Sequence, residues 1–291
     1  MKTVEKNRAV ILVTLDGVRW QEMQKESRNP FRRLWRGWGK EAVLKFGSIA
    51  NPMVMSLPAY QSIFAGATQR CYTNACARIR VPTLPEGLAA TFGPAEVASF
   101  ASWGPIERAL EHRPGSSLVC MGLGNRHRRE FDGLFEELDR TVSGDRPRWG
   151  HSRWDRHTQQ YAERYFDHAR PKFLYLGFGD GDSWAHSGRF LRYWQTLVRY
   201  DVWLERWVER ARAEWSRAGR ETLVLVTTDH GRGSGLAWSA HVLNPAGRRV
   251  WTWAHGVGDG AKAFLRDHVE PRRTLGHLQI RPLIESWMRG D

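Results

Sequence analysis

Five side chains that suit metal coordination follow directly after apolar, strand-like stretches of the chain. They are the carboxylates and imidazoles of Asp16, Asp182, His186, Asp229 and His230. Ligands of open parallel sheets bind beyond the carboxyl ends of the strands, so we expect these groups to meet at one edge. Mixed carboxylate and imidazole groups delivered by three strands indicate a site for two divalent cations.

Four of these residues form two pairs, and the spacing within each pair indicates how its side chains can be placed. Asp182 and His186 are four residues apart, so one helical turn places both side chains on the same face, where they can bind one ion. Asp229 and His230 are adjacent. Adjacent side chains point apart in regular structure, so we expect this pair at a strand end where the chain turns.

Ser56 is the candidate nucleophile, because it immediately precedes an expected helix over residues 58–65. Pro58 lies in the first turn, where proline is preferred. A serine at this position is either a helix N-cap or a nucleophile whose alkoxide and incoming phosphate the helix N-terminus stabilises. A coordinated metal would also lower the pKa of its hydroxyl.

Alternating strand and helix patterns position these groups. The expected strands are residues 9–15, 43–49, 97–101, 118–121, 173–178, 222–228 and 249–254. The expected helices are residues 58–65, 105–111, 156–169 and 189–218. This alternation predicts an α/β fold, a three-layer α/β/α sandwich with a central, mostly parallel mixed sheet. We expect one domain over residues 1–291, with rim insertions near 67–96 and 125–155.

The composition is that of a globular protein with an excess of positive charge. The 291 residues carry 44 Lys+Arg against 31 Asp+Glu, a formal net charge of +13. A positive surface attracts anions, and phosphate esters are common anionic substrates. The arginines are dispersed and no nucleic-acid-binding motif occurs, which disfavours nucleic acid as the main partner.

The cysteine content and the hydropathy of the chain indicate in which cellular compartment the protein can be expected. Three cysteines exclude a disulfide framework, although Cys71 and Cys76 can bridge in an oxidising compartment, and we expect both on a surface loop. No stretch is apolar enough for a membrane span. The first residues carry no apolar leader, so we expect a cytoplasmic protein as given, or a periplasmic or secreted one if a leader has been removed. The oligomeric state is left open.

Four short motifs together resemble the alkaline phosphatase superfamily, in particular its type I phosphodiesterase/nucleotide pyrophosphatase and cofactor-independent phosphoglycerate mutase branch. They are residues 13–17 (VTLDG), 56–60 (SLPAY), 179–186 (GDGDSWAH) and 227–233 (TTDHGRG). They occur in the family order and span most of the chain. The resemblance implies the alkaline phosphatase-like fold and a two-metal site.

The resemblance also implies which residues hold each ion. One ion is expected at Asp16, Ser56, Asp229 and His230, and the other at Asp182, His186 and a third histidine further on. His241 and His255 compete for that last place. No convincing crossover helix lies between residues 231 and 248, which favours an antiparallel last strand and therefore His241.

The remaining expectations concern substrate and reaction. We expect Asn51, Arg232 and His255 to contact substrate. The leading hypothesis is a metal-dependent hydrolase of small phosphoric esters that acts through a Ser56 phosphoenzyme, with zinc favoured and manganese second. The alternatives are a phosphodiesterase or nucleotide pyrophosphatase, a phosphonate or sulfate ester hydrolase, and, from other classes, a basic nucleic-acid-binding protein or a non-catalytic binding protein on this fold.

Overall fold

Eight strands form a single mixed sheet at the centre of the computed structural model, which describes residues 7–24, 29–123, 125–127, 129–147 and 149–290. The strand order is β2-β8-β7-β1-β6-β3-β4-β5. The strands are β1 (Arg8–Leu15), β2 (Ala42–Ser48), β3 (Val97–Ala101), β4 (Leu118–Met121), β5 (Asn125–His127), β6 (Phe173–Phe178), β7 (Glu221–Thr227) and β8 (Arg249–Val257).

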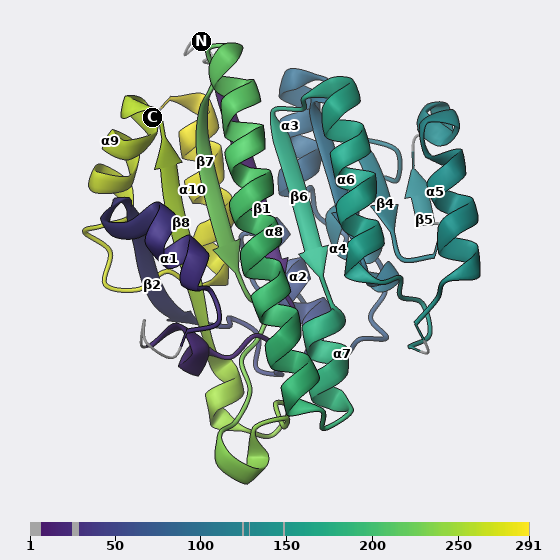
Figure 1. The fold of residues 1–291 in the computed structure, drawn as a ribbon, viewed down its shortest axis with the longest axis vertical. Helices are drawn as coiled ribbons and strands as arrows, with labels where there is room; N and C mark the ends of the chain where they lie inside the picture. Colours follow the sequence, from purple (N-terminus) through teal and green to yellow (C-terminus); the bar gives the residue numbers. More distant parts are fainter. Residues whose placement is uncertain (1–6, 25–28, 124, 128, 148, 291) are drawn as a thin grey trace.

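Helices cover both faces of this sheet. They are α1 (Arg32–Trp38), α2 (Ser56–Ala65), α3 (Leu84–Phe92), α4 (Glu107–Leu110), α5 (Asp132–Gly144), α6 (Asp155–Ala169), α7 (Asp180–His186), α8 (Phe190–Arg217), α9 (Asp259–His268) and α10 (His277–Arg289). In Figure 1, α6 and α8 lie in front of the sheet, while α2, α3 and α10 lie behind it.

Two apolar cores fill the space between these layers. Ile11 and Val13 of β1 point into the core under α6 and α8, whereas Val10 and Leu12 point into the core under α2, α3 and α10. A strand buried on both faces is expected in a parallel sheet covered by helices. The predicted three-layer α/β/α sandwich is therefore confirmed.

The pairing of the strands confirms a mostly parallel sheet with antiparallel additions. β7, β1, β6, β3 and β4 are parallel neighbours, and β8 pairs antiparallel with both β7 and β2. The antiparallel last strand is thus as predicted. β5, an antiparallel edge strand beside β4, was not expected.

The two expected rim segments contain more regular structure than the sequence suggested. Residues 67–96 include α3, and residues 125–155 include β5 and α5. Cys71 and Cys76 form a disulfide with their Cα atoms 5.6 Å apart. The expectation that both lie on the surface is wrong for Cys71, which is buried in the core beneath α2.

Among the described helices, none combines the length and the apolar composition that crossing a bilayer requires.

Candidate metal centre and active site

Three neighbouring strands bring the predicted ligands to one edge of the sheet. Leu15, the last residue of β1, pairs with Phe178 of β6, and Thr14 pairs with Thr227 of β7. The chain therefore leaves all three strands at one level. Beyond them, Asp16, Asp182 and His230 each offer a ligand atom within 4.8 Å of the other two. These distances place the three groups close enough to share a cation.

Ser56 is the first residue of α2 and is only 6% exposed. The N-cap residue is Met55, so the alternative interpretation of Ser56 as the N-cap is wrong. The Leu57 amide donates instead to Asn74 Oδ1, at 2.9 Å. The Ser56 hydroxyl is left beside His230, with Oγ 3.4 Å from Nε2.

Backbone amides fix the Asp229 carboxylate at the end of β7. Gly17 N and His230 N both donate to Asp229 Oδ1, at 2.9 and 2.8 Å. Gly17 has a φ of +64°, and a Cβ there would lie 2.4 Å from Asp182 Oδ1. A side chain at position 17 would therefore disturb both the turn and a candidate ligand.

His277 also supports this turn and was not recognised in the sequence. Its Nε2 donates to the Thr228 carbonyl, at 3.0 Å, from the first turn of α10. Burial lowers the pKa of His277 to about 4, so the imidazole is neutral at neutral pH.

Asp182 and His186 lie on one face of α7, as their spacing predicted. His186 Nε2 is 3.3 Å from Asp182 Oδ2 and 3.3 Å from His241 Nε2. The structure thus brings His186 next to both of the groups with which it was expected to share an ion.

His241 reaches this cluster from the loop between β7 and β8. Its Nδ1 is 2.9 Å from the Val54 carbonyl, which fixes the ring, and the ring stacks on His230 with centroids 4.1 Å apart. His255 is not brought to the cluster. It pairs with Val224 inside the sheet and stacks on Trp38, with centroids 4.8 Å apart.

The three expected substrate contacts do not line the pocket around Ser56 in the part of the chain that the structure describes. Asn51 is buried, and its Nδ2 donates to the Cys71 carbonyl at 2.7 Å. The fully buried Arg232 donates to the Asp182 carboxylate and to the Ser239 carbonyl. Both side chains are therefore used in holding loops and a ligand carboxylate in place.

The buried carboxylates have the properties of cation ligands. Burial and the charge of Asp229 raise the pKa of Asp16 to about 8, and burial raises the pKa of Asp229 to about 6. Asp16 Oδ1 and Asp229 Oδ2 are buried without a hydrogen-bond partner among the described residues. Buried carboxylate oxygens are costly unless a cation or donor meets them, so this donor set fits divalent metal.

Asp155, at the start of α6, holds α7 in place and was not recognised in the sequence. Its carboxylate accepts the backbone amides of Gly179 and Asp180, both at 2.8 Å, and the hydroxyls of Ser102 and Tyr200. The N-cap residue of α7 is Gly179, which has no side chain to cap the helix. Asp155 therefore caps, from another helix, the element that carries Asp182 and His186.

A pocket of about 400 Å³ opens beside Ser56. Its lining includes the candidate ligands Asp16, Asp182, His186 and His241 together with Asn74, Trp103, Trp149 and Arg153. The candidate ligands were predictable from strand ends and, for His241, from the family resemblance and the direction of the last strand. Asn74, Trp103, Trp149 and Arg153 lie in loops, which carry no such signal.

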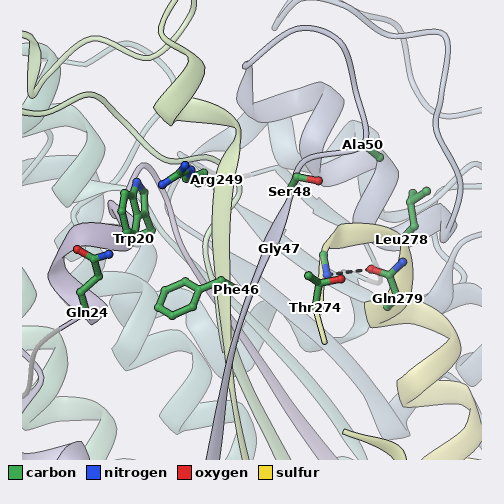
Figure 2. A pocket seen from close by; sticks show the side chains of 11 residues that line it. Trp20, Gln24, Phe46, Gly47, Ser48, Ala50, Arg249, Thr274, Leu278 and Gln279 are labelled. Atoms are coloured by element: carbon green, nitrogen blue, oxygen red, sulfur yellow. Dashed lines mark hydrogen bonds between the residues drawn. The ribbon is translucent and has the colours of Figure 1, made fainter. Parts of the chain in front are cut away.

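A second pocket, of about 600 Å³, lies along the edge strand β2, away from these ligands. Figure 2 shows Trp20, Phe46 and Arg249 on one side of it and Gln279 of α10 on the other. None of the candidate metal ligands lines it, so the chemistry is expected at the pocket around Ser56.

No protein-family model matches the chain, and no curated protein matches it in sequence. Solved structures do match. Lipooligosaccharide phosphoethanolamine transferase A (EptA) from Neisseria meningitidis, an integral membrane protein, superposes with a TM-score of 0.64 at 10% identity, covering 99% of this chain and 56% of EptA. This chain thus spans little more than half the length of EptA.

Two further structures match over most of their own length. The C-terminal periplasmic domain of phosphoethanolamine transferase EptC from Campylobacter jejuni has a TM-score of 0.62 at 9% identity, covering 97% of this chain and 89% of that domain. TAB5 alkaline phosphatase has a TM-score of 0.53 at 13% identity, covering 99% of both chains. The chain therefore has the fold of the alkaline phosphatase superfamily, as its sequence motifs predicted.

Proposed function

We propose that this protein is a metal-dependent hydrolase of small phosphoric esters in which Ser56 is the nucleophile. The observation that carries the proposal is the position of Ser56 Oγ, in the first turn of a buried helix and 3.4 Å from His230 Nε2. Beside it lie the two buried carboxylate oxygens, of Asp16 and Asp229, that lack partners among the described residues.

Two divalent ions would complete this site. Asp16, Ser56, Asp229 and His230 would hold one ion, and Asp182, His186 and His241 would hold the other. Nitrogen and oxygen ligands in small number favour zinc, with manganese second. When bound, such ions neutralise phosphate oxygens and lower the pKa of a coordinated hydroxyl.

The chain's own residues position the reaction. The N-terminus of α2 carries a partial positive charge, which favours a phosphate at Ser56. Tyr60 donates to Asp16 Oδ2, at 3.2 Å, and so orients the other oxygen of that carboxylate. Asn74 lines the pocket, and its Oδ1 is already used by the Leu57 amide. Its Nδ2 remains as the donor for a substrate oxygen.

The reaction has two steps. The Ser56 hydroxyl gives its proton to solvent as its oxygen forms a bond to phosphorus and the bond to the leaving oxygen breaks. The leaving alkoxide takes up a proton from solvent. Water then attacks the phosphoserine, which releases inorganic phosphate and restores the hydroxyl. The structural matches include a phosphoethanolamine transferase and an alkaline phosphatase, which supports chemistry at phosphorus.

The test is hydrolysis of p-nitrophenyl phosphate, bis-p-nitrophenyl phosphate and p-nitrophenyl sulfate by protein loaded with zinc or manganese. We expect turnover of the monoester and a loss of at least about 1,000-fold in Ser56→Ala, since the nucleophile is removed. Intact mass of acid-quenched protein should show one added phosphoryl group in the wild type and none in Ser56→Ala.

Ser62→Ala is the matched control, because Ser62 lies in the same helix, is also buried, and donates only to the Pro58 carbonyl at 2.9 Å. Its activity should stay within a few-fold of the wild type. Undiminished turnover in Ser56→Ala would exclude Ser56 as the nucleophile, and preference for the diester or the sulfate would replace the monoester assignment.

A further inference from the structure

Two tryptophans line the pocket that also holds the candidate metal ligands. Trp103 and Trp149 are both half-buried and share the pocket with Ser56. Trp149 packs edge to face against Trp184 and Trp154, with ring centroids 4.9 and 5.2 Å apart. Because Trp184 belongs to α7, this aromatic wall, defined as Trp103 and Trp149, is connected to the helix that carries Asp182 and His186.

The backbone beneath the aromatic wall is held in place before any ligand binds. The Gly104 amide donates to the His151 carbonyl at 3.1 Å, and the Arg153 amide donates to the Ser102 carbonyl at 3.0 Å. Trp103 and Ser152 also form a β-bridge. A wall fixed in this way offers apolar surface without a large ordering cost on binding.

The charges around this part of the pocket disfavour a second anionic group on the substrate. Arg153 is the one Lys or Arg side chain among the described residues that line the pocket. It is 1% exposed, and its guanidinium donates to Thr158 Oγ1 and to the carbonyl and sulfur of Cys120. Each of the three guanidinium nitrogens therefore already donates to a protein atom.

We propose that the aromatic wall is the subsite for the leaving group, and that this group is an uncharged ring. The substrate class is then a phosphate ester of an uncharged aromatic or other ring-bearing alcohol, rather than a nucleoside polyphosphate. This inference rests on the proposed function at Ser56 and adds the identity of the group that leaves. Ring packing against tryptophan, together with the apolar area buried, provides the selectivity.

The experiment compares benzyl phosphate with methyl phosphate, because both release simple alcohols of similar acidity and differ mainly in the ring. We expect a wild-type kcat/KM at least about 10-fold higher for benzyl phosphate. Trp149→Ala should lower kcat/KM for benzyl phosphate about 10-fold and leave methyl phosphate within about twofold, since only the ring contact is lost. Trp149→Phe, which keeps a ring, should restore most of the difference.

Trp194→Ala is the control, because Trp194 is a half-buried tryptophan of α8 that does not line the pocket. Equal losses for both esters in Trp149→Ala, or no loss for either, would overturn the leaving-group subsite while leaving the proposed function intact. ATP turnover as efficient as that of benzyl phosphate would overturn the charge argument. Failure of the metal-loaded wild type to hydrolyse any ester would instead overturn the proposed function, and this inference with it.

Discussion

Asp155→Asn tests whether the metal centre depends on a cap supplied from outside α7. Asp155 Oδ1 accepts from Gly179 N and the Ser102 hydroxyl, and Oδ2 accepts from Asp180 N and the Tyr200 hydroxyl. Asparagine has the same shape but replaces one acceptor oxygen with an NH₂ group. One of the two backbone amides at the start of α7 then faces the NH₂ group of the asparagine, which is a donor and cannot accept its hydrogen bond.

The expected loss in the free energy of unfolding follows from these contacts. The substitution removes two hydrogen bonds to a charged acceptor, each of which contributes about 1.5–3 kcal/mol. Part of this is offset, because burial raises the pKa of Asp155 and the carboxylate is costly to keep charged there. We therefore expect a loss of about 2–4 kcal/mol in the free energy of unfolding, measured by urea denaturation monitored by circular dichroism.

Metal affinity shows whether Asp155 positions the candidate ligands or only stabilises the fold. Asp182 and His186 lie on α7, so we expect Asp155→Asn to weaken metal binding about 10- to 100-fold, as measured by competition with a chromogenic chelator. Asp201→Asn is the matched control, because Asp201 is buried and accepts the backbone amides of Arg33 and Leu34 at the start of α1, away from the site. It should lose similar stability and keep its metal affinity. Equal weakening of metal binding in both variants, or a stability loss below about 1 kcal/mol in Asp155→Asn, would refute the reasoning.

Two further predictions concern the competing histidines. His241→Ala should lower the metal content measured by elemental analysis by about one ion per chain, while His255→Ala should retain both ions. The reverse result would show that the ligand choice is wrong. Burial lowers the pKa of His255 to about 4. The unfolded state therefore binds more protons below pH 6.5, and the stability of the wild type should fall by about 3 kcal/mol more than that of His255→Phe between pH 7 and pH 4 in urea unfolding. Parallel pH profiles would contradict this.

The expected strands were predictable because their signal is local and strong. Continuous apolar runs such as residues 9–15 and 173–178 are buried on both faces in the structure. The missed elements lack that signal. β5 has only three residues, all polar, and α3 contains Pro85 and Gly87, which weaken its helix signal. For α3, the capping box formed by Thr83 and Glu86 was a readable sign of a helix start.

The site was predictable where the topology of the sheet determines position. Asp16, Asp182 and Asp229 follow the ends of adjacent parallel strands, so their convergence follows from strand order and direction. The prediction that His241 joins the site needed one further step. The last strand was inferred to be antiparallel because no crossover helix was found before it. The structure confirms that strand direction and brings His241 to His186.

The side chains expected to contact substrate do not line the pocket around Ser56. Neighbouring protein groups, which the sequence does not show, already bind them. Arg232 lies two residues after His230 in the chain, yet its guanidinium donates to the Asp182 carboxylate and the Ser239 carbonyl. Asn51 precedes Ser56, the proposed nucleophile, by only five residues, but its amide donates to the Cys71 carbonyl. Conversely, Trp149 and Asp155 enter the pocket region through contacts between distant segments. Strand ends therefore predict where the candidate ligands gather, whereas the residues proposed to position and select a substrate are brought there by tertiary contacts that a single sequence does not show.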